Sequence, residues 1–378
     1  MDMQNYRDSI NAIDEQMVDL FVRRMNIVEK IAHYKQENHL PELDPERERQ
    51  IKNKVTAQAG DELADYTGVL YQTVFDVSRS YQRRITTKPG ALSQMLDNVI
   101  AETPKTRPDR AVVACQGVEG AYSQHACDKM FKYPNILYFS AFEDIFKAVD
   151  SGLCRYGVLP LENSSAGSVN EVYDLMRNYH FYITHSVKLC IEHRLLAPQG
   201  SKLEDIKEIY SHEQAIHQCS DFIAKTGAKV HVCKNTAQAA KLVAEAGRTD
   251  IAAIGSRECE SLYNLQVLSD NVQNTQNNYT RFICISKTPE IYPGAKKTSL
   301  MMTLAHKPGS LYHTIAQFAA LGLNLTKLES RPISGSDFEF MFYFDIEASI
   351  YSPALRALIT QLEQDGEGFT YLGSYTED

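Results

Sequence analysis

The stretch YGVLPLENSSAGSV, at residues 156–169, decides how the largest part of this chain folds. Its first residues, YGVLPL, form a continuous apolar run, which is typical of a strand covered on both faces. The small hydrogen-bonding side chains that follow are Glu162, Asn163, Ser164 and Ser165. They come at the carboxyl end of the strand, where open α/β sheets place their ligands. A polar turn with a helix cap at Ser168 would explain the run if it stood alone, so its interpretation depends on the rest of the chain.

Length and charge limit the class of protein. The chain has 378 residues, more than one ordinary core holds, so we expect about two to three domains. Its net charge of -9 gives no basic field for nucleic acid or an anionic membrane, so an anionic substrate would need locally placed cations. No apolar stretch is long enough to span a bilayer, and MDMQNYRDSI lacks the apolar core of a signal peptide. We expect a cytoplasmic protein.

The eight cysteines are scattered, with no CxxC pair and no histidines at metal-ligand spacing. We expect most of them to be reduced and buried as small hydrophobic residues. The spacing supports neither a metal site nor thiol catalysis, and we expect the protein to need no metal and no organic cofactor.

Residues 1–86 contain little glycine and show the apolar spacing of helices. The heptad positions of the first helix are Ile10, Ile13, Met17, Leu20, Ile27 and Ile31. Asp44 and Pro45 are the residue types of a helix cap and a first helical turn, so a second helix should begin there. The apolar spacing predicts a third helix over about 62–85.

Polar side chains lie along the apolar face of these helices. Arg24 is on the heptad line of the first helix, so its guanidinium should face other helices and requires an anion there. Arg7 and Lys35 lie on the adjoining line, and Ser78 and Gln82 are one turn apart on the third helix. An amphipathic bundle with solvated arginines and a few ion pairs could account for any one of them. Together they favour a small dianion held inside a helical bundle.

This polar pattern resembles the all-helical chorismate mutase family over residues 1–86. The matching residues are Arg7, Asp14, Arg24, Lys35, Asp44, Arg47, Glu48, Ser78 and Gln82. The resemblance implies that Arg7 and Arg24 clamp the two carboxylates of chorismate. It implies that Lys35 and Gln82 face the ether oxygen, that Glu48 and Asp44 hold the ring hydroxyl, and that Arg47 and Ser78 complete the pocket. In this family the partner's first helix donates an arginine, so Arg7 would act in trans and the protein would be a homodimer.

The chemistry agrees with such a pocket. A Claisen rearrangement needs no nucleophile or base, only a compact substrate conformer and positive groups where charge gathers on the breaking C–O bond. Whether dimers pair into tetramers is left open by the sequence.

From residue 111 to about 286, short apolar runs alternate with helical patterns, which is the rhythm of α/β lobes. The segments GVEGAYSQHA, YGVLPLENSSAGSV, ITHSVKLCIEH, YSHEQAIHQC, AAIGSRE and NYTRFICI resemble the prephenate dehydratase family, in order and over this whole module. The resemblance implies two α/β lobes, like those of periplasmic binding proteins, with a cleft between them. We place this domain at 109–287 and its second lobe at about 193–267.

Prephenate loses a ring hydroxyl and a carboxylate together, so the enzyme chiefly needs an acid for the departing hydroxyl. The resemblance assigns that role to Thr280, and because threonine is a weak acid, Arg281 or the substrate would have to polarise it. His212 could be the acid instead, although a structural role is commoner for such a histidine. The remaining expected pocket residues are Asn163, Glu162, Ser164, Ser165, Thr184, Ser211, Gln214, Gln218, Arg281 and Phe282.

The last part of the chain, at 297–378, has the order βαββαβ of a ferredoxin-like unit, and residues 89–108 form a linker around a short helix. The segment beginning TSLMMTLAHKPGSLYHTIAQF resembles an ACT domain, which in this family binds L-phenylalanine at a dimer interface. The residues that match are Gly309, Ser310, Leu311, Glu329, Ser330 and Arg331. A ferredoxin-like unit that only holds a dimer together is the alternative.

The sequence therefore predicts a multidomain chain: an all-α bundle at 1–88, a two-lobed α/β domain and an α+β ferredoxin-like domain. The resemblances imply a bifunctional enzyme that converts chorismate to prephenate and prephenate to phenylpyruvate, with feedback inhibition by L-phenylalanine. A dehydratase that prefers arogenate is one alternative, and a non-catalytic phenylalanine sensor built on solute-binding lobes is another.

Overall fold

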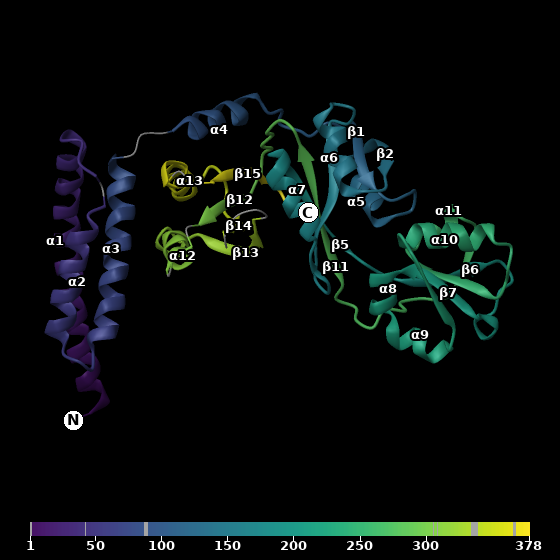
Figure 1. Ribbon diagram of the computed structural model, residues 1–378, viewed down its shortest axis with the longest axis horizontal. Coiled ribbons are helices and arrows are strands. Elements are labelled where there is room, and N and C mark those ends of the chain that lie inside the picture. Colours follow the sequence, from purple (N-terminus) through teal and green to yellow (C-terminus); the bar gives the residue numbers. More distant parts are fainter. Residues whose placement is uncertain are drawn as a thin grey trace.

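A computed structural model describes residues 2–41, 43–86, 90–304, 306–307, 309–333, 339–365 and 368–378. The boundary expected at 88–89 lies outside these described residues. A helical domain, a two-lobed α/β domain and an α+β domain follow one another along the chain (Figure 1). In the described part of the chain, no helix has both the length and the apolar character needed to cross a membrane.

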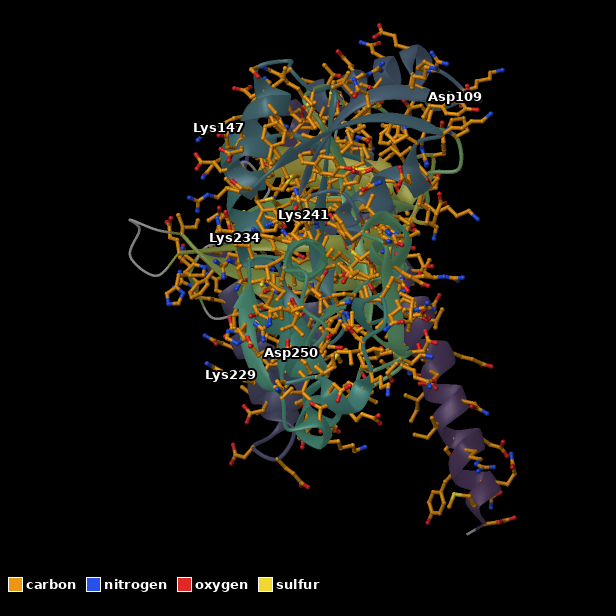
Figure 2. The ribbon with its side chains drawn as sticks, turned by 90° about the vertical axis from the view of Figure 1, so that its right-hand side faces the viewer. Asp109, Lys147, Lys229, Lys234, Lys241 and Asp250 are labelled. Atoms are coloured by element: carbon orange, nitrogen blue, oxygen red, sulfur yellow. The ribbon has the colours of Figure 1, made fainter. Side chains whose placement is uncertain are left out.

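Three helices build the N-terminal domain: α1 (Met3–Glu37), α2 (Pro45–Ala59) and α3 (Ala64–Thr86). The start of α2 is the predicted one, because the Asp44 carboxylate accepts a hydrogen bond from the Arg47 backbone N–H at 3.0 Å. Both α1 and α2 pack on α3. The only residues of α1 that are buried are Val28 and Ala32, and the first half of α1 projects away from the rest of the protein (Figure 2).

The first lobe of the α/β domain has a six-stranded sheet in the order β2-β1-β3-β11-β5, with β4 paired to β3. Its elements are β1 (Arg110–Gln116), α5 (Tyr122–Met130), β2 (Tyr133–Phe139), α6 (Phe142–Asp150), β3 (Tyr156–Asn163), β4 (Gly167–Ser168), α7 (Asn170–Tyr179), β5 (Tyr182–Cys190) and β11 (Tyr279–Ser286). The predicted strand, β3, lies at the centre and is buried along almost its whole length. It is parallel to β1 and antiparallel to β11, which brings Asn163 opposite Thr280.

The second lobe has a five-stranded sheet in the order β10-β6-β9-β7-β8. Its elements are β6 (Arg194–Pro198), the 3-10 helix η1 (Leu203–Asp205), β7 (Glu208–His212), α8 (Glu213–Gln218), α9 (Ser220–Thr226), β8 (Lys229–Cys233), α10 (Thr236–Glu245), β9 (Ile251–Gly255), α11 (Glu258–Leu262) and β10 (Leu265–Ser269). The chain crosses between the lobes twice, from β5 to β6 and from β10 to β11. Two crossings leave the lobes facing each other across a cleft.

The C-terminal domain has an antiparallel four-stranded sheet in the order β13-β14-β12-β15, which with its βαββαβ sequence is ferredoxin-like. Its elements are β12 (Lys297–Leu304), α12 (Ser310–Ala320), β13 (Asn324–Pro332), β14 (Phe340–Glu347), α13 (Pro353–Asp365) and β15 (Thr370–Tyr375). Helix α4 (Ala91–Glu102), in the segment expected to be a linker, packs here: Leu96 is fully buried in a cluster with Phe344 and Leu358. The connecting segment is therefore part of this domain's core.

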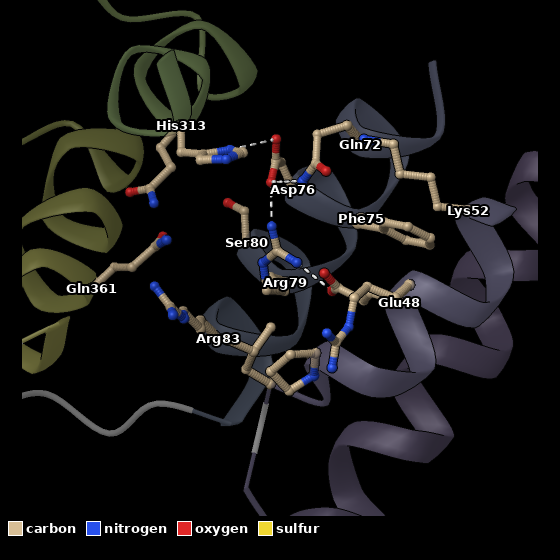
Figure 3. Close-up of a pocket in the computed structure, with 14 residues that line it drawn as sticks. Glu48, Lys52, Gln72, Phe75, Asp76, Arg79, Ser80, Arg83, His313 and Gln361 are labelled. Atoms are coloured by element: carbon tan, nitrogen blue, oxygen red, sulfur yellow. Dashed lines mark hydrogen bonds and ion pairs between the residues drawn. The ribbon is translucent and has the colours of Figure 1, made fainter. Parts of the chain in front are cut away.

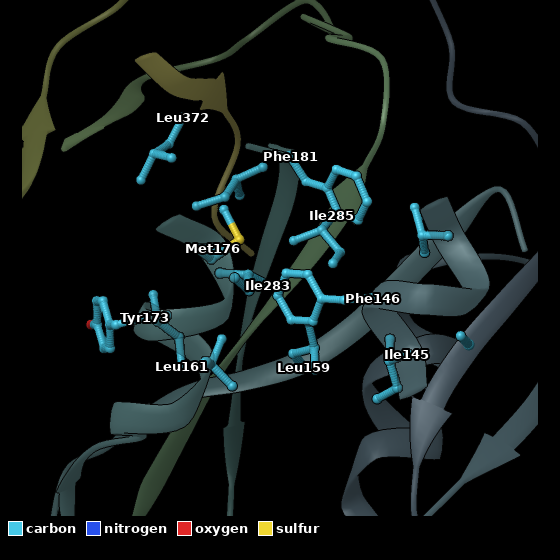
Figure 4. Packing of buried hydrophobic residues seen from close by; sticks show 14 of the residues in the cluster. Ile145, Phe146, Leu159, Leu161, Tyr173, Met176, Phe181, Ile283, Ile285 and Leu372 are labelled. Atoms are coloured by element: carbon cyan, nitrogen blue, oxygen red, sulfur yellow. The ribbon is translucent and has the colours of Figure 1, made fainter. Parts of the chain in front are cut away.

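The C-terminal domain also shares a hydrophobic core with the first lobe. Leu161, Tyr173 and Ile283 of the lobe belong to one buried cluster with Tyr343 and Leu372 of the C-terminal sheet (Figure 4). The rings of Tyr173 and Tyr343 meet edge to face at 4.9 Å. Because a single close-packed apolar cluster spans both domains, a movement of the C-terminal sheet is transmitted to the lobe that carries β3 and β11.

Candidate active sites

A cavity of about 360 Å³ lies between the two lobes. Its lining includes Asn163 and Thr280 from the first lobe and Gln214 and Gln218 from the second. The structure thus brings together four of the residues expected in the dehydratase pocket. His212 lines the cavity as well.

Asn163 is the centre of the hydrogen bonding in this cavity. Its side-chain oxygen accepts from the backbone N–H groups of Ser165 and Ala166, both at 2.9 Å, which identifies that atom as the oxygen. Its nitrogen donates to the side-chain oxygen of Asn278 at 2.8 Å and to Oγ1 of Thr280 at 2.9 Å. The hydroxyl of Thr280 is therefore held as an acceptor by Asn163, and its own proton remains for another partner.

The network continues through two residues that the sequence reasoning missed, Asn278 and His193. The side-chain nitrogen of Asn278 donates to Oε1 of Gln218 at 3.0 Å, and Nε2 of His193 lies 3.0 Å from the same oxygen. Since Oε1 can only accept, the His193 proton is on Nε2. Nδ1 of His193 is buried and has no hydrogen-bond partner among the residues that the structure describes. Burial lowers the pKa of this histidine, although the bond to Gln218 acts against it. His193 ends the motif ITHSVKLCIEH, and Asn278 begins the motif NYTRFICI. That position was the sequence signal that could have identified them as pocket residues.

Several expected pocket residues lie beside the cavity and stabilise its walls. The Ser164 hydroxyl donates to the Asn277 carbonyl at 3.0 Å, and the hydroxyl of Ser165 lies 3.5 Å from Asn278. The buried hydroxyls of Thr184 and Ser211 donate to the backbone carbonyls of Cys284 and Ile254, at 3.3 and 2.8 Å. Phe282 belongs to a buried apolar cluster under the sheet. These side chains are not among the residues that line the cavity.

Arg281 and Glu162 point away from the cavity, which differs from the expectation that Arg281 polarises Thr280. Consecutive strand residues face opposite sides of a sheet, so Arg281 meets the C-terminal domain while Thr280 meets the cleft. The Arg281 guanidinium is 2% exposed; it pairs with Asp345, with Glu162 at 3.2 Å and with Glu377 at 2.8 Å. Burial by itself lowers the pKa of Arg281, but the acidic groups around it raise the pKa overall.

Glu162 is held by the same interface. Its carboxylate accepts from Lys327 of β13 at 2.6 Å as well as from Arg281. Burial raises the pKa of Glu162, but these two cations outweigh that effect, so that the pKa lies below its ordinary value. Glu162 therefore connects the end of β3 to the C-terminal domain rather than to a ligand in the cleft.

His212 caps helix α8. Its Nδ1 accepts a hydrogen bond from the backbone N–H of Gln214 at 3.3 Å, and burial lowers its pKa. A histidine that uses Nδ1 as an acceptor and resists protonation is poorly suited to donate a proton at neutral pH. The geometry favours the structural role over the acid role.

The cavity has a positive wall on the side of the second lobe. Lys234 lines it and forms no ion pair with the residues that the structure describes, and the first turn of α10, at Asn235 and Thr236, lines it too. No aspartate or glutamate is among its described lining residues. A lysine beside a helix N-terminus favours anionic ligands. Sequence reasoning missed Lys234, since it follows a strand at a place with no motif.

In the helical domain, the structure places Arg24 against Ser78: the guanidinium donates to that hydroxyl. Burial lowers the pKa of Arg24, although the charges of Tyr71 and Glu48 act in the opposite direction. Gln82 lies one turn beyond Ser78, and its buried side-chain oxygen has no hydrogen-bond partner in the described part of the chain. Lys35 is half-buried near the end of α1.

Arg7, Asp44 and Arg47 are exposed in the single chain. Arg7 lies 17 residues before Arg24 on one continuous helix, a separation of about 25 Å at 1.5 Å per residue. One copy therefore cannot bring both arginines to one small ligand. The Asp44 carboxylate is engaged in capping α2.

The apolar face of α1 is uncovered in the single chain. Ile10, Met17, Leu20 and Ile27 are between 51% and 59% exposed although they occupy heptad positions. A contiguous apolar stripe of this length is a surface for another helix.

The two segments that resemble a phenylalanine site have different surroundings in the single chain. Gly309 precedes α12 with φ of +88°, and Ser310 and Leu311 line an open cavity of about 360 Å³. On β13, Glu329 accepts from the Ser168 hydroxyl at 2.5 Å and Arg331 pairs with Asp174 of α7 at 2.9 Å. Ser330 lies exposed between them. Glu329 and Arg331 thus contact the first lobe directly.

Comparison with known proteins identifies the families of the helical domain and of the α/β domain. Residues 6–83 match the family model of chorismate mutase type II, and residues 113–290 match that of prephenate dehydratase. A bifunctional chorismate mutase/prephenate dehydratase of Enterobacter agglomerans is 32% identical over 385 residues, covering 98% of this chain and 95% of that protein.

Two further relatives match smaller shares of the chain. Arogenate dehydratase/prephenate dehydratase 2 of Arabidopsis thaliana is 35% identical, covering 77% of this chain and 78% of that protein. The crystal structure of the prephenate dehydratase of Arthrobacter aurescens in complex with L-Phe is 25% identical with a TM-score of 0.65, covering 70% of this chain and 89% of that one. The chain belongs to the family of bifunctional chorismate mutase/prephenate dehydratases.

Proposed function

We propose that the N-terminal domain rearranges chorismate to prephenate, that the interlobe cavity converts prephenate to phenylpyruvate, and that L-phenylalanine inhibits the enzyme through an ACT domain at the C-terminus. The observation that carries this proposal is the position of Thr280. Its hydroxyl lies in the cavity, accepts a hydrogen bond from Asn163, and keeps its proton for a ligand.

The dehydratase step follows from this geometry. The ring hydroxyl of prephenate leaves as water once it gains a proton. The carboxylate on the opposite ring carbon leaves as carbon dioxide, and the electrons of the broken C–C bond pass through the ring double bonds and complete the aromatic ring. Thr280 donates its hydrogen bond to the departing hydroxyl, and Asn163 fixes the direction of that bond. Gln214, Gln218 and Lys234 on the opposite wall are placed to hold the substrate's carboxylates and carbonyl. The gain of aromaticity supplies the driving force, so a positioned donor is sufficient.

The mutase step needs positive groups and a closed pocket. Arg24 and Lys35 of one chain, with Gln82, would face the two carboxylates and the ether oxygen, and Glu48 would hold the ring hydroxyl. The second carboxylate clamp, Arg7, comes from another copy, because it lies about 25 Å from Arg24 along α1.

A homodimer completes this site. The exposed stripe along α1 supports the dimer, since pairing two first helices would cover the apolar side chains and carry each Arg7 to the other copy. Tetramers stay an open prediction, as does the cytoplasmic location.

Feedback by L-phenylalanine has two supports. The C-terminal domain has ferredoxin-like topology with Gly309–Leu311 and Glu329–Arg331 as matching segments, and the relative from Arthrobacter aurescens was solved with L-Phe. In this chain the second segment already touches the lobe through Ser168 and Asp174. A ligand that engages Glu329 would therefore compete with a contact to the catalytic domain.

Arogenate is the second candidate substrate of the cleft, because a relative that is 35% identical carries arogenate dehydratase in its name. Arogenate has an ammonium group where prephenate has a keto group. Lys234 on the cavity wall disfavours a second cation, and the mutase domain produces prephenate, so prephenate is the substrate we propose.

The test is a coupled assay of the full chain. Chorismate should give phenylpyruvate, the rate should fall when phenylalanine is added, and prephenate should be turned over faster than arogenate under equal conditions. Binding of phenylalanine without turnover of chorismate, prephenate or arogenate would contradict the proposal and favour a non-catalytic sensor.

A further inference from the structure

A cavity of about 720 Å³ lies between the helical domain and the C-terminal domain, and the two sites described above do not account for it. It is lined by α2 and α3 on one side and by His313, Gln317 and Gln361 of α12 and α13 on the other (Figure 3). One of its lining residues is Glu48, which the proposed mutase site uses.

A continuous line of charged contacts crosses this cavity from Glu48 to the C-terminal domain. Arg79 of α3 pairs with Glu48 through one guanidinium nitrogen and with Asp76 through the other. The second carboxylate oxygen of Asp76 accepts a hydrogen bond from Nδ1 of His313 at 3.0 Å. Figure 3 shows the side chains of all four residues directed at one another. Arg79 thus has partners on α2 and α3, and Asp76 has partners on α3 and α12.

The line is partly shielded from water. The Asp76 side chain is 7% exposed, Arg79 19% and Glu48 27%. Charge-assisted hydrogen bonds at such burial hold side-chain positions more firmly than surface ion pairs do. Gln72 adds a weaker contact to Asp76 at 3.4 Å.

A second contact joins the same two helices. The hydroxyls of Tyr312 and Thr73 lie 3.3 Å apart, one residue before His313 and one helical turn before Asp76. The first turn of α12 therefore contacts α3 through two adjacent residues, Tyr312 and His313. That turn follows directly on Gly309.

We propose that Arg79 is a positioning residue of the mutase site, which holds the Glu48 carboxylate for the substrate's ring hydroxyl, and that His313 of the C-terminal domain sets the position of Arg79 through Asp76. This inference rests on the proposed mutase function. Arg79 acts through Glu48 and does not contact the reacting atoms.

The arrangement has a kinetic consequence. A hydrogen bond to the ring hydroxyl is present in the bound substrate and in the transition state alike, so its loss weakens substrate binding more than it slows the bound complex. Disorder of Glu48 should therefore raise KM for chorismate more than it lowers kcat. A purely structural role of Arg79 would lower the amount of folded enzyme and leave KM unchanged.

The experiment measures mutase kinetics of the full chain with chorismate for Arg79→Met, Arg79→Lys, His313→Ala and His313→Asn, and for the double variant Arg79→Met/His313→Ala. We expect Arg79→Met to raise KM roughly 5- to 20-fold. This is less than the roughly 12- to 160-fold cost of losing a charged hydrogen bond outright, because Arg79 acts on the substrate only through Glu48. Arg79→Lys, which keeps one charged contact, should recover part of this. His313→Ala should raise KM by about 2- to 5-fold, and His313→Asn, whose amide can replace Nδ1–H, should restore it.

Non-additive effects of the two replacements on KM would show that Arg79 and His313 act through the same line of contacts. In the double variant, loss of His313 should add nothing to loss of Arg79, because both act on the same carboxylate. Arg49→Met is the matched control: it removes an exposed positive charge from the same cavity, next to Glu48 in sequence, and should leave KM within two-fold. Dehydratase turnover of each preparation reports that the chain is folded.

The outcomes separate this inference from the proposed function. An unaltered chain that does not convert chorismate would contradict the mutase assignment itself. An active unaltered chain with an unchanged KM in Arg79→Met, or with fully additive effects of Arg79 and His313, would overturn the positioning role and leave the mutase assignment in place.

Discussion

The side-chain amide of Asn163 donates a hydrogen bond to the hydroxyl of Thr280, with 2.9 Å between nitrogen and oxygen. The bond joins the ends of two antiparallel strands, β3 and β11, at the mouth of the interlobe cavity. Because the Asn163 oxygen is occupied by two backbone N–H groups, the amide cannot turn over and accept from Thr280 instead. The fold therefore fixes Thr280 as a donor toward the cavity.

Replacement of Thr280 tests that donor. Thr280→Ala should lower formation of phenylpyruvate from prephenate by roughly 10²- to 10⁴-fold, the usual effect of losing a positioned proton donor. Thr280→Ser should keep part of the activity, because a hydroxyl remains within reach of Asn163. Steady-state kinetics with prephenate are the measurement. An alanine variant with ordinary turnover would remove Thr280 from the mechanism and return attention to His212.

Lys234 should influence which substrate the cleft prefers. Lys234→Met should lower kcat/KM for prephenate by about 5-fold at low salt, with a smaller effect at high salt, as expected for one partly solvated charge. The ratio of prephenate to arogenate turnover should fall, and Lys234→Glu should lower it further. Lys241→Met is the matched control, because Lys241 is an exposed lysine on helix α10, which begins two residues after Lys234, and it pairs with Glu245. Equal ratios in the Lys234 and Lys241 variants would show that Lys234 does not select the substrate.

The helical domain offers an independent prediction. Lys35→Ala should cost on the order of 10²-fold or more in mutase turnover, as for the loss of a preorganised donor to a developing charge. Dehydratase turnover in the same preparation should stay near normal, because the dehydratase cleft lies between the two lobes of a different domain. Mutase activity that stays within a few-fold of the unaltered chain would mean that the polar side chains along the apolar face of α1 have a structural role only.

The residues that were placed well from the sequence were those whose position follows from one strand. The run at 156–163 is β3, and the polar cluster at its end reaches the cavity through Asn163. Arg281 shows where such reasoning stops. A neighbour of Thr280 in sequence faces the other side of the sheet, and its partner Asp345 comes from a domain 64 residues later in the chain. No local pattern encodes that pairing. The exposed face of α1 is a second case, since the heptad residues expected to be covered are exposed in the single chain.

The interface around Arg281 should make stability depend on pH. Glu377 contacts Arg281, Lys188 and Lys297, each at 2.8 Å. Burial raises the pKa of Glu377, but Arg281 and the two lysines lower it to about 2, from an ordinary value of 4.5. A depressed folded pKa gives stability that is fully present above pH 4.5 and is lost as the pH falls toward 2.

Glu377→Gln isolates this contribution. The free energy of unfolding of the unaltered chain should fall between pH 6 and pH 3 by about 1–2 kcal/mol more than that of the variant. The remainder of the contribution is lost only below pH 3, because the folded pKa is about 2. Urea unfolding at the two pH values is the measurement. The same pH dependence in both proteins would mean that Glu377 does not link the domains energetically.

Feedback inhibition should depend on Glu329 and Ser330. In the single chain Glu329 is held by Ser168 of the first lobe, at 2.5 Å, and by Lys327 at 3.5 Å. A phenylalanine ammonium that recruits this carboxylate must break the contact to the lobe, so ligand binding and lobe position are coupled. Glu329→Ala and Ser330→Ala should therefore lose inhibition, when each is compared with its own rate without phenylalanine. A coupling of about 1–3 kcal/mol corresponds to a shift in affinity of roughly 5- to 150-fold, which is enough for feedback.

Ser168→Ala distinguishes the coupling from simple loss of a ligand contact. It removes the competing partner of Glu329 and leaves the expected phenylalanine residues in place, so phenylalanine should inhibit at a lower concentration than in the unaltered chain. Dehydratase rates measured over a range of phenylalanine concentrations provide both comparisons. If potency is unchanged in all three variants, phenylalanine acts elsewhere, most simply as a product analogue in the interlobe cavity, and its inhibition should then be competitive with prephenate.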